Sequence, residues 1–103
     1  MNARQELSHS LELAVPSAGM SEEEFLQLLA DAVDYWMQHR MEQLMSLCYT
    51  LDVEEPTVAA AFHPAAPEPA NVGLAKALYA RQLARLQTKH DHQPPVLDDE
   101  DAW

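Results

Sequence analysis

The sequence predicts an all-α protein: a small antiparallel bundle of about four helices with a disordered N-terminal arm and an acidic C-terminal tail. Apolar residues recur at the three- and four-residue spacing of a helix face through residues 21–90, and helix start signals precede these segments. A chain of 103 residues holds one domain at most. We therefore expect a flexible arm over residues 1–20, a helical domain over 21–90 and a disordered tail over 91–103.

The first helix of the domain has the clearest start signal. Ser21 is suited to the N-cap position, and Glu24 completes a capping box three residues later. Met20 and Phe25 can form the hydrophobic staple around this start. An apolar stripe then continues to Trp36, which predicts an amphipathic helix.

A second helix is expected over roughly residues 40–51. An unbroken helix from Glu22 to Leu51 would be about 45 Å long at 1.5 Å per residue, too long for so small a domain to cover. The sequence therefore favours a corner near Arg40. The second helix is apolar over most of its circumference, which predicts that it is the central, buried element.

Two further helices complete the expected bundle. Asp52 and Glu55 repeat the capping-box spacing and predict the start of a short third helix. A proline-rich linker at residues 63–69 cannot be regular helix, and a last helix should run from about Pro69 to His90. Its predicted inward seam, flanked by two leucines at positions 74 and 78, follows 3.5-residue spacing: Val72, Ala75, Tyr79, Leu83 and Leu86.

Composition disfavours nucleic-acid binding and argues against a membrane protein. The chain has 17 acidic and 6 basic residues and a formal net charge of −11, which makes it repel phosphate backbones and anionic membranes. No run approaches the roughly 18 apolar residues of a membrane span, and the N-terminus does not lead into a signal-peptide-like apolar stretch. We expect a soluble, cytoplasmic protein. Cys48 is the only cysteine, so an intramolecular disulfide and a multi-cysteine zinc site are excluded.

A soft apolar stripe is the first candidate for binding a partner. Met37, Met41 and Met45 recur every four residues and are joined by Trp36 and Tyr49. Methionine is common in ordinary cores but also forms adaptable surfaces for partner helices. Both readings are open at this point.

The last helix carries the second candidate. Four of the six basic residues belong to it, and Tyr79, Arg81 and Arg85 are its candidate interaction residues. This basic face could receive an acidic partner, RNA or the chain's own acidic tail. The alternative is a solvated face that neutralises acids on neighbouring helices.

The sequence predicts no catalytic, cofactor-binding or metal-binding residues. Two glycines cannot build a glycine-rich phosphate loop, and the apolar neighbours of Cys48 should raise the pKa of its thiol. His90-Asp91-His92, near the acids of residues 98–101, could supply metal ligands, but adjacent groups at a chain end organise a site poorly.

Two segments carry a family resemblance. The stretch Met41–Glu55, followed by Leu78–Gln87, resembles a group of short, uncharacterised helical proteins from bacteria. The resemblance covers about half of the chain and rests on helix-forming residues. It implies a helical fold and no particular activity or site.

From these observations we expect a non-catalytic protein that acts in protein–protein interaction or assembly through helix–helix contacts, as a homodimer or with another helical protein. Small cores often gain stability by such pairing. No small-molecule substrate is indicated. One alternative is a small metal-dependent accessory protein or enzyme that uses the tail histidines and carboxylates. Another is a regulator that binds nucleic acid through the basic face of the last helix.

Overall fold

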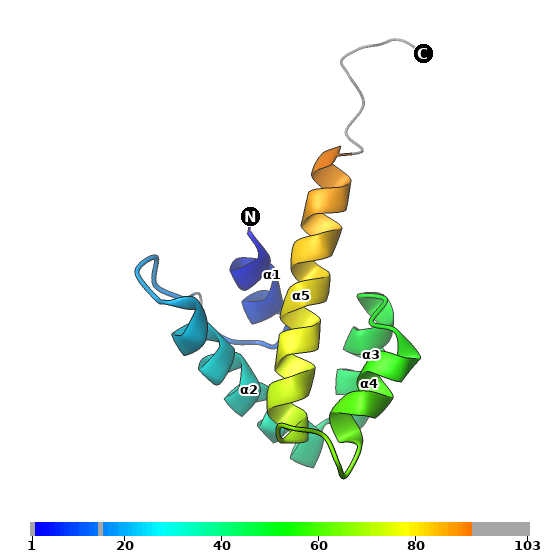
Figure 1. The fold of residues 1–103 in the computed structure, drawn as a ribbon. Helices are drawn as coiled ribbons and strands as arrows, with labels where there is room; N and C mark the ends of the chain where they lie inside the picture. The colour runs from blue at the N-terminus through cyan, green and yellow to red at the C-terminus, as the bar shows by residue number, and fades with distance from the viewer. Residues whose placement is uncertain (1, 15, 92–103) are drawn as a thin grey trace.

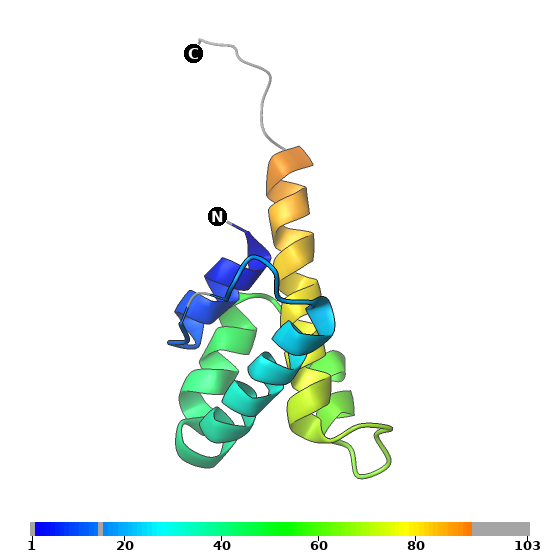
Figure 2. The same cartoon turned by 90° about the vertical axis from the view of Figure 1, so that its left-hand side faces the viewer.

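The regular structure is entirely helical in the part of the chain that the computed structural model describes, residues 2–14 and 16–91, with side-chain surroundings up to Gln87. The helices are α1 (Ala3–Ser10), α2 (Glu22–His39), α3 (Met41–Thr50), α4 (Glu55–Phe62) and α5 (Ala70–Asp91). The predicted all-α class is confirmed for these residues. Helices α2 to α5 run alternately in opposite directions (Figures 1 and 2). The predicted tail lies outside the described residues, except that Asp91 is the last residue of α5.

Helix α5 is the central element of the fold. Helices α1, α2 and α4 pack against it, whereas α3 packs chiefly against α2 (Figure 1). The prediction that the segment over residues 40–51 is central was therefore wrong. Only Leu44 and Cys48 are buried within α3, while Met41 and Tyr49 are exposed. At 1.5 Å per residue, the 10 residues of α3 span about 15 Å and the 22 of α5 about 33 Å, so α5 offers about twice the length for contacts with other helices.

The buried face of α5 differs from the predicted seam. Ala75 and Tyr79 are buried as expected, but Leu74 and Leu78 are fully buried and Leu83 is 44% exposed. The core therefore lies on the side of α5 that carries positions 74 and 78. Helical spacing predicts that one of several adjacent apolar stripes on α5 is buried but does not distinguish between them. The positions of α1 and α2 determine which stripe is buried.

The predicted start of α2 is confirmed in detail. Ser21 Oγ accepts a hydrogen bond from the backbone N–H of Glu24 at 3.1 Å, and the Glu24 carboxylate accepts one from the backbone N–H of Ser21 at 2.9 Å. Phe25 is fully buried beyond this capping box. The corner is also confirmed: α2 ends at His39, and Arg40, with φ −143° and ψ 47°, separates it from α3.

The N-terminal residues correct the sequence prediction. Residues 3–10 form a helix, with a capping box between Asn2 and Gln5, where we expected a flexible arm. Leu7 and Leu11 are 0% and 1% exposed and belong to the hydrophobic core. The short apolar spacing that looked too weak to fold alone is stabilised by burial against α5.

Two arginines tie this first helix and its connection to the rest of the fold. Arg40 donates hydrogen bonds to both carboxylate oxygens of Glu12, at 2.9 and 3.1 Å, and its guanidinium lies 4.3 Å from the Trp36 ring centroid. Arg4 donates to the carbonyl oxygen of Met20 at 2.6 Å. Both contacts join residues far apart in the sequence.

Asp52 ends α3 rather than starting α4. Its backbone is left-handed, with φ 61°. Its N–H donates to the carbonyl of Tyr49 at 3.0 Å, and the N–H of Val53 donates to that of Cys48 at 2.9 Å. This is the Schellman arrangement that closes a helix C-terminus. The predicted capping box at Asp52 was therefore wrong; α4 has Glu54 as its N-cap residue, without a side-chain cap bond.

No helix among the described residues combines the length and the hydropathy that crossing a membrane requires.

Candidate protein-binding groove

The predicted methionine and tryptophan stripe does not form one surface. Trp36 is buried, at 7% exposure, and Met37 and Met45 are half-buried against the core. Met41 is 39% exposed and Tyr49 is 84% exposed. The corner between α2 and α3 interrupts the four-residue recurrence, so three of the five residues serve the core.

The basic face of α5 packs against the end of α3. Arg81 Nε donates to the carbonyl oxygen of Leu51 at 2.8 Å, and Arg85 Nη1 donates to that of Thr50 at 3.3 Å. Arg85 also lies 3.7 Å from the carboxylate of Asp52. Positive charge at a helix C-terminus is favourable because the last carbonyls carry partial negative charge. These two arginines therefore cap α3, a role that the sequence did not indicate.

Tyr79, the remaining candidate on α5, belongs to the core. It is 8% exposed, and its ring centroid lies 5.4 Å from that of Phe25. Its hydroxyl accepts a hydrogen bond from Arg4 Nε at 3.5 Å. It stabilises the packing of α1, α2 and α5 and is not free to contact a partner.

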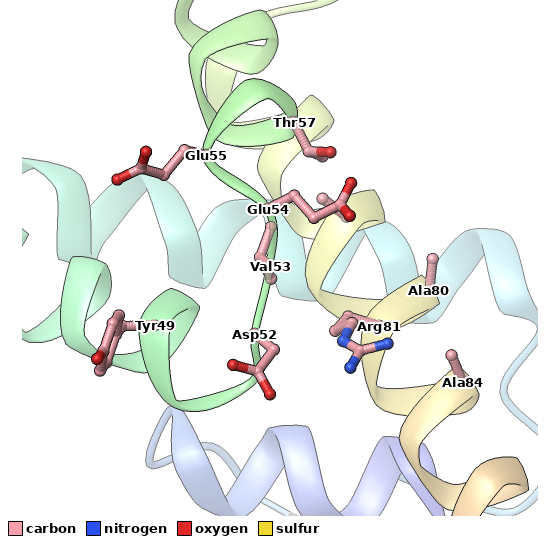
Figure 3. A pocket seen from close by; sticks show the side chains of 10 residues that line it. Tyr49, Asp52, Val53, Glu54, Glu55, Thr57, Ala80, Arg81 and Ala84 are labelled. Atoms are coloured by element: carbon pink, nitrogen blue, oxygen red, sulfur yellow. The ribbon is translucent and has the colours of Figure 1, made fainter.

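A surface hollow lies beside the connection between α3 and α4, where it faces α5 (Figure 3). It is an open groove of about 880 Å³. We call it the α3–α5 groove. Its lining residues come from the end of α3, the connection, the start of α4 and one side of α5: Tyr49, Asp52, Val53, Glu54, Glu55, Thr57, Ala77, Ala80, Arg81 and Ala84.

The α5 side of the groove consists largely of small side chains. Ala77, Ala80 and Ala84 are spaced three and four residues apart, so they share one helix face. This face differs from the one that α5 buries against α1 and α2. Ala80 and Ala84 are exposed and Ala77 is half-buried, so another element can approach the α5 backbone closely at positions 80 and 84.

The opposite side carries charge and one aromatic ring. Glu54 extends toward α5, whereas Glu55 and Tyr49 lie on the outer side of the connection (Figure 3). Asp52 adds a third carboxylate, and Arg81 is the one basic residue that lines the groove. The α3–α5 groove is therefore apolar along α5 and acidic along the connection.

Sequence reasoning found Tyr49 and Arg81 but missed the alanines. They recur at helical spacing on α5, yet alanine is compatible with core, surface and groove alike. The signal that could have found them is the contrast between a row without large side chains and the leucine-rich stripe on the same helix.

Nothing in the described part of the chain assembles a metal centre: no three His, Cys, Asp or Glu side chains there lie together closely enough. Of the predicted alternative ligands, His92 and the acids of residues 98–101 lie outside the described residues, and His90 is placed only as part of α5. Cys48 is buried, and this burial raises the pKa of its thiol.

No protein-family model, curated protein or solved structure matches the chain. The geometry of its own residues therefore carries the functional argument.

Proposed function

We propose that this chain is a non-catalytic interaction protein that binds a helical segment of another protein in the α3–α5 groove. The observation that carries the proposal is Tyr49. It is 84% exposed, more than any other large hydrophobic side chain in the described residues, and it borders an open groove with an alanine side.

Tyrosine is enriched at the energetic centres of protein interfaces, because its ring buries a large area at little cost in conformational entropy. The alanines complement it. Two helices approach each other to about 8 Å when the residues at their contact are small. A partner helix can thus lie along Ala77, Ala80 and Ala84, with Tyr49 at the opposite edge of the groove (Figure 3).

The sequence predicts a cytoplasmic protein that pairs either with a second copy or with another helical protein, and the α3–α5 groove is proposed as the site for the second kind of partner. The structure changes the surface on which a dimer would form, because Trp36 and Tyr79 are buried. Arg81 and Arg85 already bond the end of α3, which reduces the support for nucleic-acid binding through this face.

The test is a selection from a displayed library of helical peptides with randomised exposed positions. The blocked variant carries Ala80→Gln and Ala84→Gln, which fill the groove without adding charge. The control, Ala59→Gln, makes one such change at an exposed position of α4 outside the groove. Circular dichroism at 222 nm verifies that all variants fold.

We expect enriched peptides to bind wild type and Ala59→Gln equally and to bind the blocked variant at least about tenfold more weakly, the loss of about 1.4 kcal/mol. Equal binding to all three proteins, or a library that yields no binder, would overturn the proposal.

A further inference from the structure

We infer that the helix that occupies the α3–α5 groove is basic, with Lys or Arg side chains flanking a stripe of small apolar residues. This inference rests on the proposed function and specifies the chemistry of its partner. It comes from the distribution of charge around the groove.

The charges that line the groove do not balance. Asp52, Glu54 and Glu55 stand against the single guanidinium of Arg81. That guanidinium donates to the carbonyl oxygen of Leu51 at 2.8 Å, so part of its charge stabilises the C-terminus of α3.

The carboxylates differ in how far they are paired. Asp52 lies 3.7 Å from Arg85, whereas Glu54 and Glu55 make no ion pair with another described residue. Both glutamates are exposed, and Glu54 extends toward the α5 side of the groove (Figure 3). A cation on a helix lying along the alanines would meet this carboxylate.

Tyr49 favours the same partner chemistry. The face of a tyrosine ring attracts ammonium and guanidinium groups, and arginine is the more frequent of the two in such contacts. A basic side chain that extends to this edge of the groove can therefore interact with the ring.

A second copy of the chain fits the groove less well. A two-fold interface brings the same patch of both copies together, so two grooves, each lined by three carboxylates and one guanidinium, would face each other. Each copy also carries a formal net charge of −11. The electrostatics thus favour a basic partner over self-association.

The experiment uses the peptides selected above and a pair of charge variants. Glu54→Gln/Glu55→Gln neutralises the groove. The control Glu22→Gln/Glu42→Gln removes two carboxylate charges from exposed positions outside the groove, and both of these residues, like Glu55, lie in the first turn of a helix. Affinities are measured by fluorescence anisotropy at about 20 and about 200 mM salt, since exposed charge pairs weaken as salt rises.

If the inference is correct, peptides that depend on the groove are enriched in Lys and Arg. They bind Glu54→Gln/Glu55→Gln about tenfold more weakly at low salt and the control within about twofold of wild type, as exposed charge pairs predict. The difference shrinks at high salt.

Two outcomes would overturn the basic-helix inference and leave the proposed function standing. In the first, the peptides that depend on the groove are not enriched in Lys and Arg. In the second, they bind both charge variants with equal affinity. Peptides that ignore the Ala80→Gln/Ala84→Gln block would overturn both. A micromolar dimer in sedimentation equilibrium that the same block dissociates would replace the basic partner with a second copy.

Discussion

The replacement Leu7→Ala tests whether α1 is part of the folded domain. Leu7 is 0% exposed and packs in the core that α1 shares with α5. Truncating a buried leucine to alanine costs about 2.7–5 kcal/mol, and a site that can collapse lies at the lower end. Because α1 has only eight residues and can shift toward α5, we expect a loss of about 3 kcal/mol in the free energy of unfolding.

Urea denaturation followed by circular dichroism at 222 nm measures this loss. Domains of this size have total stabilities of about 5–15 kcal/mol, so the variant should still fold. With a urea m-value of about 1.5 kcal/mol per molar, the midpoint should fall by about 2 M.

Leu83→Ala is the matched control, since the same side chain is removed from a position that is 44% exposed. Its midpoint should fall by less than about 0.7 M, because only part of the leucine surface is buried. If Leu7→Ala moved the midpoint no further than Leu83→Ala, the docking of α1 would be refuted, and the flexible arm that the sequence predicts would be correct.

Three further predictions follow from the contacts of single residues. Arg81→Gln should lower the free energy of unfolding by about 1–2 kcal/mol, because the charged hydrogen bond to the carbonyl of Leu51 is lost; an unchanged urea midpoint would contradict the capping role. The pKa of Glu24 is lowered below its ordinary 4.5, chiefly by the hydrogen bond from the Ser21 backbone and then by that from its side chain. A lowered pKa in the folded state stabilises the protein above pH 4.5, and this contribution is lost as the pH falls through the folded pKa. Wild type should therefore be more stable than Glu24→Gln at pH 7, and the difference should disappear in acid; a difference that is constant with pH would be inconsistent with this assignment. Burial raises the pKa of the Cys48 thiol, so an aromatic disulfide reagent at pH 8 should modify the native protein at least about 10³-fold more slowly than the urea-unfolded chain; comparable rates would show that the thiol is accessible.

Local signals in the sequence were sufficient to predict a structural feature where the residues that form it are close together in the chain. The capping box of Ser21 and Glu24 joins residues three apart, so its hydrogen bonds follow from the local pattern. The last helix starts and ends within one residue of its predicted bounds for the same kind of reason: proline limits its start, and helical apolar spacing continues to its end.

Other local patterns were ambiguous between two structures. Asp52 with Glu55 matched a capping box, yet the backbone of Asp52 closes the preceding helix with a positive φ. Aspartate is favoured at N-caps and is tolerated in left-handed conformations. The contacts of Arg85 with Asp52 and with the carbonyl of Thr50, 35 residues before it in the chain, help to hold this end of α3. Contacts between residues so far apart in the chain cannot be predicted from a segment of a few residues.

The sequence by itself determined the all-α class, the start of α2, the corner at Arg40 and the extent of α5, because helix signals act through residues within one or two turns of each other. Only the tertiary structure decided that α1 belongs to the core, that α5 rather than α3 is central, and that Tyr49 and the alanines of α5 border one groove. Those outcomes depend on which of several apolar faces meet. Burial against a distant partner contributes more free energy than local propensity does, and helical periodicity does not specify that partner.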